Sequence, residues 1–179
     1  MIKGVAGMAG ELGHVQIPVQ DVIESDQPIP RCNCGFLGDV ESLASLTGIK
    51  NNLLPYWLPK FPDHPLAGES ISSAAKQLRG YAEREDPLAL AVFGQQAKAI
   101  GKLFTIAANF TDPDVYFVGG GVVEAAPSFR QWFLNTVREH TQLRQEQIAA
   151  ANFALVPDLD MAGARGAAVA AFDAVVADR

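Results

Sequence analysis

Two cysteines, Cys32 and Cys34, stand one residue apart in the segment RCNCGFLGDVES, which covers residues 31–42. A disulfide between them would close a very small ring, and its geometry is strained across one intervening residue. The glycines around them indicate a turn, where neither thiol would join a hydrophobic core. Thiolates in such a turn are good ligands for zinc when further ligands lie nearby. The spacing therefore favours a metal over a disulfide.

Two other residues near this pair are suitable metal ligands. His14 lies upstream in the segment GELGH, and Asp39 lies downstream in the same glycine-rich segment. One histidine and two cysteines suit zinc, whose tetrahedral sites need a fourth ligand, and Asp39 is the candidate. Asp39 also directly precedes VESLASLTG, an expected helix that it could cap with a side-chain oxygen. Both roles stay open here, and one carboxylate can fill both with different oxygens.

Acids and glycines elsewhere allow a functional and a plain interpretation. Glu11 and Glu41 stand next to candidate ligands, but lone acids are usually solvated surface residues. Gly119, Gly120 and Gly121 follow the apolar run VYFV and precede an expected helix. Such glycines let a backbone approach a nucleotide, and the N-terminus of a helix favours phosphate. A tight turn between a strand and a helix would need the same glycines.

The composition is that of one ordinary acidic domain. The chain has 179 residues, 49% of them apolar, which is enough to bury a core without disulfides. A formal charge of −6 and a pI near 5.0 argue against a nucleic-acid surface, which needs a basic face. The sequence has neither an apolar run of membrane-spanning length nor the layout of a secretory signal. Unpaired thiols in a loop fit a reducing cytoplasm.

The first half of the chain is expected to be loop-rich. Residues 1–39 predict loops around one short strand, HVQIPV, and residues 40–48 predict a short helix that ends at Gly48. The segment NNLLPYWLPKFPDHP contains four prolines and predicts an irregular, aromatic connection. The opening segment, MIKGVAGMAGELGH, would start a domain in the middle of a loop. We therefore expect the chain to be a piece of something longer.

The second half predicts an α/β arrangement with parallel strands. SISSAAKQLRGYAERE predicts a helix, and a longer helix is expected over residues 87–110 with Asp86 as its N-cap. The runs VYFV and NFALVP predict strands, each followed by a helix, the last of them rich in small residues and able to pack on a sheet. We expect His64 and His140 to be surface residues, and Asp112 and Asp114 to be turn residues, with no functional role for any of the four.

Together these segments resemble the ROK family of bacterial sugar kinases, related sugar-responsive repressors and open reading frames. The family pattern GExGH, then CxCGxxGCxExxxS, is matched by GELGH and by CNCGFLGDVESLAS. The segments VYFVGGGVVEAAPSF and DMAGARGAAVAA resemble its nucleotide-side strand and turn and its closing helix. The likeness spans nearly the whole chain and corresponds to the C-terminal half of a family member. In two respects the chain departs from the pattern: Asp39 replaces the third cysteine, and the stretch between His14 and Cys32 is longer.

The resemblance implies a fold and a site. The fold would be α/β, the C-terminal lobe of an actin-like ATPase or ribonuclease H-like fold, with an incomplete three-layer α/β/α arrangement. It would form a single domain over residues 1–179, with the sugar and zinc signature in 1–50, the irregular connection in 51–68 and the nucleotide side in 69–179. Three sets of residues would act there: Glu11, His14 and Glu41 to bind the sugar, His14, Cys32, Cys34 and Asp39 to bind zinc, and Gly119, Gly120 and Gly121 to face the nucleotide.

The resemblance also implies a reaction for the full-length relative, namely transfer of a phosphoryl group from ATP, with Mg, to a hexose such as glucose. By the same resemblance, the catalytic aspartate and the phosphate-gripping lobe belong upstream of GMAGELGH, and the chain contains neither a DxGxT-like loop nor an Asn-Asp pair. The chain alone is thus expected to be inactive. Two alternatives are the effector and dimerisation domain of a sugar-responsive repressor, and an inactive remnant that still folds.

A homodimer or larger assembly is also expected, because ROK relatives pair through this half. The face left by a missing lobe would be apolar and costly in water. Trp57, Tyr56 and Phe61 are typical of interface anchors. The alternative is that these aromatic side chains fold back on their own core.

Overall fold

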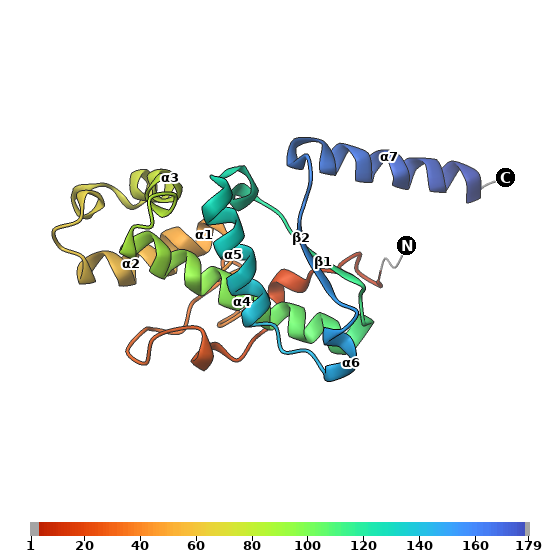
Figure 1. The fold of residues 1–179 in the computed structure, drawn as a ribbon, viewed down its shortest axis with the longest axis horizontal. Coiled ribbons are helices and arrows are strands. Elements are labelled where there is room, and N and C mark those ends of the chain that lie inside the picture. Colours follow the sequence, from red (N-terminus) through yellow and green to blue (C-terminus); the bar gives the residue numbers. More distant parts are fainter. Residues whose placement is uncertain (1–3, 178–179) are drawn as a thin grey trace.

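The helix α4 (Pro87–Thr111) forms the centre of the molecule (Figure 1). The computed structural model describes residues 4–177. The start of α4 follows its sequence signals, because Oδ1 of Asp86 accepts the backbone N–H of Ala89 at 3.0 Å and a proline follows it. The apolar face of α4 is buried against α3 (Ile71–Ala82) and α5 (Pro127–Glu139). The helices expected over residues 70–85 and 87–110 are therefore confirmed as α3 and α4.

Beside these helices lies a parallel pair of strands, β1 (Val115–Val118) and β2 (Asn152–Leu155). The chain crosses between them through α5 and the short α6 (Gln145–Ile148) (Figure 1). The expected α/β class with parallel strands is therefore confirmed, although the described sheet has two strands.

Helices cover one face of this sheet. The ring centroids of Tyr116 and Phe153 lie 5.0 and 6.2 Å from that of Phe104 on α4. On β1, Val115 and Phe117 alternate with the buried residues and are exposed to 37% and 56%. Among the described residues, that second face is left largely open.

The proline-rich segment is mostly helical, where an irregular connection was expected. Helix α1 (Leu46–Gly48) leads into a π turn, η3 (Ile49–Leu53), then α2 (Leu54–Trp57) and the 3-10 turn η4 (Leu58–Lys60). The prolines fit because Pro55 and Pro59 each occupy the first turn of a new element, where the missing N–H costs least.

Gly48 was expected to end a helix, but the helical run continues through it. A Cβ at this position would stand 2.6 Å from the carbonyl oxygen of Ser42, so glycine is required for close approach. The glycine therefore marks tight packing of α1 on the preceding turn.

The expected strand HVQIPV is reduced to an isolated antiparallel bridge between Gln16 and Asp39. The short 3-10 turns η1 (Leu12–His14) and η2 (Val19–Asp21) flank it. The strand pairing does not extend past Ile17 because the next residue, Pro18, has no N–H to donate. It does not extend in the other direction because the segment that contains Asp39 enters a turn at Glu41.

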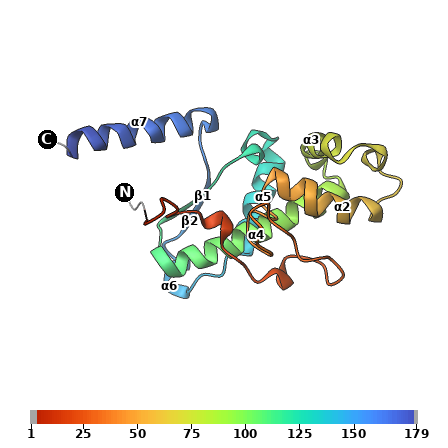
Figure 2. The same cartoon turned by 180° about the vertical axis from the view of Figure 1, so that it is seen from behind.

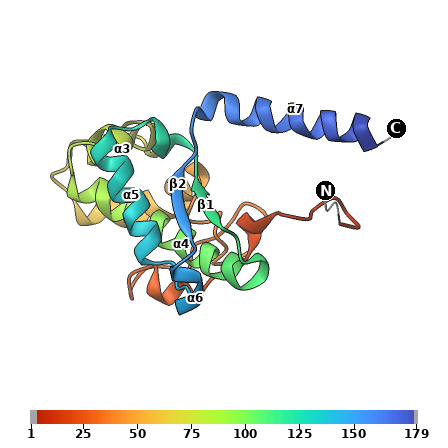
Figure 3. The ribbon, with the colours of Figure 1, turned by 45° about the vertical axis from the view of Figure 1, so that its right-hand side comes forward.

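The last helix, α7 (Leu159–Ala177), projects from the body as a separate arm in all three views (Figures 1, 2 and 3). We expected it to pack on the sheet. Instead it leaves large apolar side chains exposed: Met161, Val169, Phe172, Val175 and Val176. Helices that are apolar all round are normally buried. Apolar surface is thus exposed on α7 and on the open face of β1, and not mainly on the helix over residues 87–110 and the aromatic segment, where it was expected.

The aromatic residues expected as interface anchors mostly join the body of the protein. Trp57 and Phe61 are partly buried against the core, and Nε1 of Trp57 donates to Oε1 of Gln95 at 3.0 Å. Tyr56 donates its hydroxyl hydrogen to Asp26, which also accepts from Lys60. For Trp57 and Phe61 the structure therefore favours the alternative that they fold back on their own core.

Candidate metal and sugar site

Two segments far apart in the sequence run side by side at the site. The backbone N–H of Val40 donates to Val15 at 3.1 Å, and that of Glu41 donates to Gly13 at 2.8 Å. This antiparallel contact places His14, at the end of η1, beside Asp39 and Glu41. Both cysteines lie on a tight hairpin, in which the backbone N–H of Cys32 donates to the carbonyl oxygen of Phe36 at 2.9 Å.

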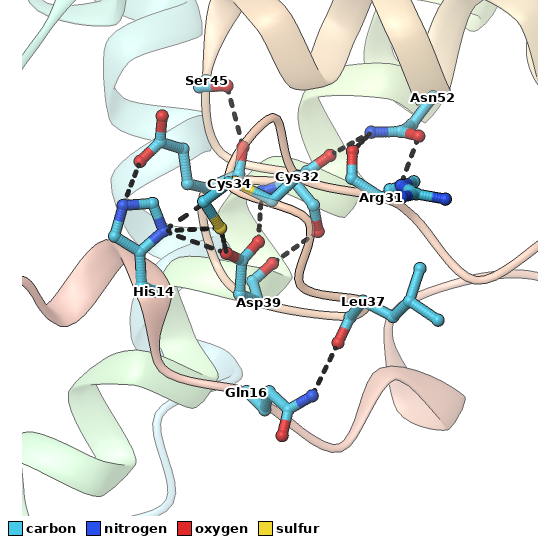
Figure 4. A network of polar contacts seen from close by, with 11 residues as sticks. His14, Gln16, Arg31, Cys32, Cys34, Leu37, Asp39, Ser45 and Asn52 are labelled. Carbon is cyan, nitrogen blue, oxygen red and sulfur yellow. Dashed lines mark hydrogen bonds and ion pairs between the residues drawn. The ribbon is translucent and has the colours of Figure 1, made fainter.

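The structure brings all four predicted metal ligands together (Figure 4). The donor atoms of His14, Cys32, Cys34 and Asp39 lie within 4.8 Å of one another. Nδ1 of His14 lies 3.8 Å from Sγ of Cys32, 3.5 Å from Sγ of Cys34 and 3.1 Å from Oδ2 of Asp39. Sγ of Cys34 lies 3.7 Å from the same carboxylate oxygen.

The separations of 3.1–3.8 Å from Nδ1 of His14 are close to those around a tetrahedral zinc ion, while the full set of four atoms spans up to 4.8 Å. Zinc bonds of roughly 2.0–2.3 Å at tetrahedral angles place neighbouring ligand atoms about 3.3–3.8 Å apart. The sulfur, nitrogen and oxygen donors match a borderline-soft divalent ion. Both cysteines are free thiols, as the argument against a disulfide predicted. The residues present therefore fit the metal that the family resemblance implies, and zinc itself remains a proposal.

Asp39 uses its two carboxylate oxygens for two different tasks. Oδ1 accepts the backbone N–H of Ser42 at 2.8 Å, which caps the turn that follows. Oδ2 faces His14 and the thiol of Cys34. Both roles predicted for this residue are thus geometrically available at once, and the side chain is fully buried.

Charge and hydrogen bonding shift the pKa values of the cluster. The hydrogen bond to Asp39 raises the pKa of His14 above its usual range; partial burial opposes this rise, and the charges of Glu41 and Glu11 add to it. Burial by itself would raise the pKa of Asp39, but hydrogen bonds from His14 and Ser42 outweigh it and lower the pKa. Without metal, the carboxylate and the imidazole thus stabilise each other's charged forms.

The two cysteines differ in accessibility. Cys32 is 5% exposed, and its burial raises the pKa of the thiol to about 11. Cys34 is exposed. A metal would have to displace the proton of a buried thiol at one position and bind an open one at the other.

The opposite side of His14 faces the predicted sugar ligands. Nε2 lies 3.5 Å from Oε2 of Glu41, whose side chain is 45% exposed. Glu11 is exposed at the N-terminal end of η1, and its charge contributes to the raised pKa of His14. One nitrogen of the imidazole thus lies among the candidate metal ligands, and the other lies beside an accessible acidic patch formed by Glu11 and Glu41.

The predicted glycine turn lies at the carboxyl end of β1, next to a hollow. Gly120 has φ +81°, a conformation that favours glycine. The hollow, of about 690 Å³, lies between residues 123–124, just after this turn, and residues 155–161, which begin at the last residue of β2. Arg130 lies on its wall. Carboxyl ends of parallel strands are the usual ligand edge of such sheets.

Arg79 on α3 and Glu83, the residue that caps the C-terminal end of α3, hold this turn and were missed by the sequence reasoning. Arg79 donates to the carbonyl of Gly121 at 3.0 Å and to Glu124 at 2.8 Å. Glu83 accepts the backbone N–H of Ala126 at 3.0 Å. Charged residues on a helix carry no sequence signal that would connect them to a turn more than 40 residues away.

His64 was expected at the surface, but its side chain is only 8% exposed. Its Nδ1 accepts the N–H of Leu66 at 3.0 Å, and its Nε2 lies 3.0 Å from Oδ2 of Asp86. The ring therefore joins the turn before α3 to the cap of α4.

Comparison with known proteins decides the family. The profile described as the ROK family matches residues 1–174. The chain belongs to the ROK family. A glucokinase of Halalkalibacterium halodurans is 30% identical over 143 residues, which are 78% of this chain and 40% of that protein. An N-acetylglucosamine repressor of Escherichia coli O157:H7 is 28% identical over 124 residues, which are 68% of this chain and 27% of the repressor.

The fold agrees with this assignment. The crystal structure of an ROK hexokinase from Thermus thermophilus superposes with a TM-score of 0.66 at 24% identity, covering 94% of this chain and 49% of that one. The fold class expected from the resemblance, that of ROK sugar kinases, is therefore confirmed. This ROK chain spans less than half the length of these relatives. Across residues 4–177, no helix is long and apolar enough to cross a membrane.

Proposed function

We propose that this ROK chain is the sugar-recognition and oligomerisation half of a glucokinase-like sugar kinase. The full-length protein would transfer a phosphoryl group from ATP to a hexose, with glucose as the first candidate, in the cytoplasm. The observation that carries the proposal is the position of the His14 ring. Its Nδ1 lies among the candidate metal ligands, and its Nε2 lies beside the carboxylate of Glu41. A side chain in this position connects metal binding to a polar, accessible patch.

In this proposal Glu11, His14 and Glu41 bind the hydroxyl groups of the sugar. Carboxylates can accept two neighbouring hydroxyls at once, and the unpaired acceptors left behind would reject a sugar that lacks one of them. His14 would hold one hydroxyl through Nε2 while Nδ1 is occupied on the other side. Glu41 is 45% exposed, so a ligand can reach its carboxylate.

The proposed zinc is structural. Held by His14, Cys32, Cys34 and Asp39, it would supply a fixed tetrahedral anchor for the hairpin and for the imidazole ring. Asp39 keeps the turn at Ser42 capped in the same arrangement. The chain's own residues would thereby present Nε2 of His14 to the sugar in one orientation.

For the nucleotide, we propose Gly119, Gly120 and Gly121 as the adenosine-side contact in the full-length kinase, with Mg carried by ATP. Val123 and Glu124, which follow the glycine turn, line the hollow at the carboxyl ends of β1 and β2. Backbone without side chains can approach a nucleotide closely there. Arg130 at the wall adds a positive charge near the expected phosphates.

A second candidate is the effector and dimerisation domain of a sugar-responsive repressor, because an N-acetylglucosamine repressor is about as similar to this chain as the glucokinase is. The coding sequence upstream of Met1 separates the two. An in-frame DxGGT and NDxN would support the kinase, and a basic helix-turn-helix would support the repressor. Either protein would use this half to bind a sugar and to form a homodimer or a higher oligomer.

Calorimetric titration of the chain with glucose, with N-acetylglucosamine and with a deoxy-glucose tests the sugar site. We expect one of the first two to bind, and Glu41→Gln to weaken it about tenfold or more, since a hydrogen bond to a charged group is lost. Glu146→Gln, an exposed acid on α6, serves as the control and should bind normally. Absence of binding by the unmodified chain to every sugar would contradict the proposal.

A further inference from the structure

The site described above has a support that no motif identifies, namely the side-chain amide of Asn52. This residue lies in the π turn η3, within a segment whose prolines predicted an irregular connection. π turns inside helices are rare and often occur at functional sites. Figure 4 shows the amide of Asn52 directed at Arg31, the residue before Cys32.

The amide makes a two-way pair with one backbone unit. Oδ1 of Asn52 accepts the N–H of Arg31 at 3.1 Å, and Nδ2 donates to the carbonyl oxygen of Arg31 at 3.0 Å. Because both backbone groups of Arg31 are engaged, the first arm of the cysteine hairpin cannot slide past η3. The other arm is tied at the same level by the bridge between Arg31 and Leu37.

The same amide nitrogen also reaches the far end of the metal segment. Nδ2 of Asn52 donates to the carbonyl oxygen of Ser42 at 2.8 Å. Ser42 is the residue whose N–H is capped by Oδ1 of Asp39, and its hydroxyl donates to the carbonyl oxygen of Asp39 at 2.6 Å. One side chain therefore holds the residue before Cys32 and the turn after Asp39 in fixed relation.

We propose that Asn52 is a positioning residue of the metal site. It touches none of the four ligand side chains, but it sets the distance between the hairpin of Cys32 and Cys34 and the turn of Asp39. An aspartate at this position would be a poor substitute, because a carboxylate oxygen would replace the two N–H donors and face two carbonyl oxygens. The inference rests on the proposed metal site.

Binding of cobalt(II) and zinc to the full chain, after removal of metal with a chelator, tests this role. Cobalt reports tetrahedral thiolate coordination through its visible absorption, and zinc affinity is measured by competition with a chromophoric chelator. We expect Asn52→Ala and Asn52→Asp to bind zinc about tenfold more weakly or worse and to lose part of the tetrahedral cobalt absorption, as outer-shell changes commonly do.

Two controls separate positioning from loss of stability. Asn109→Ala removes an exposed amide on α4 that donates to the carbonyl oxygen of Thr105 on the same helix at 2.8 Å, and should retain full affinity. Val137→Ala removes two methyl groups from a fully buried position on α5 and should lower the melting temperature while leaving zinc affinity unchanged.

The outcomes are distinguishable. If the unmodified chain binds zinc and Asn52→Ala binds it equally well with the same cobalt spectrum, the positioning role is wrong and the metal site stands. If Val137→Ala loses as much affinity as Asn52→Ala, the effect is one of global stability, and the positioning role is likewise wrong. If the unmodified chain binds neither metal, the proposal of a metal site is wrong, and so is the positioning role of Asn52.

Discussion

Oδ2 of Asp39 lies 3.1 Å from Nδ1 of His14, although 25 positions separate the two residues in the sequence. A second histidine–aspartate pair in the chain has a similar arrangement, with Oδ2 of Asp86 3.0 Å from Nε2 of His64 and Oδ1 capping a backbone N–H. The two pairs differ in their surroundings, because only the first has two thiols within 4 Å of its histidine. The second pair thus provides an internal control for the first.

Substitutions of Asp39 should separate its two roles, as a metal ligand and as a cap of the following turn. Asp39→Asn keeps an oxygen for the Ser42 N–H and should lower zinc affinity while costing little stability. Asp39→Cys should raise zinc affinity, because a thiolate is the softer ligand, and should cost about 1 kcal/mol of unfolding free energy without metal through loss of the cap. Asp86→Asn is the matched control and should leave zinc affinity unchanged. Chelator competition and thermal unfolding measure both quantities; equal affinities for all variants would mean that Asp39 is only a cap.

Zinc should copurify with the chain at a ratio near one. Replacing either thiolate, by Cys32→Ser or Cys34→Ser, should release the metal because a neutral hydroxyl is a poor zinc ligand. Residues 31–48 should then exchange their amide hydrogens faster, while α4 and α5 stay protected. Elemental analysis and hydrogen exchange check this. Protein prepared without chelator and found free of metal would contradict it.

The two thiols should react at different rates in metal-free protein. Iodoacetamide attacks thiolates, so exposed Cys34 should be alkylated first, while Cys32, buried and with its pKa raised to about 11, should react slowly at neutral pH. Added zinc should protect both. Peptide mass spectrometry over time reads the order of modification, and equal rates at the two positions would show that the hairpin is open in solution.

The isolated chain should not phosphorylate glucose with ATP. Neither an Asn-Asp pair that could supply the base nor a DxGxT-like phosphate loop occurs in its sequence. A coupled assay of the purified chain measures this directly, with a complete ROK glucokinase as the positive control. Robust turnover that copurifies with the chain would refute the proposed division of roles.

Self-association should occur at micromolar concentration. Phe117, 56% exposed on the open face of β1, and Phe172, 69% exposed on α7, are costly to leave in water. Phe117→Lys should shift sedimentation toward the monomer without loss of helical circular dichroism, since the residue is exposed. Lys76→Ala, on the exposed side of α3, should change nothing. A clean monomer for the unmodified chain across this range would rule out the assembly.

Local signals in the sequence were sufficient for several elements. The cap at Asp86 and the apolar spacing that follows predicted α4, and the change of period at VYFV predicted β1, because these signals act within a few residues. The spacing of Cys32 and Cys34 favoured a metal over a disulfide. His14 and Asp39 were inferred as the further ligands from their residue types and their position near the cysteines, and all four residues lie together in the structure.

Other features were decided by tertiary structure. Pro55 and Pro59 predicted irregular chain, yet each begins a new helical turn, an outcome that depends on the π turn before them and on packing against α4. Asn52 has no sequence signal, because its partners at Arg31 and Ser42 are backbone groups that any residue carries. Hydrogen bonds between a side chain and distant backbone depend on how the chain folds in space, and a local pattern of residue types cannot encode them.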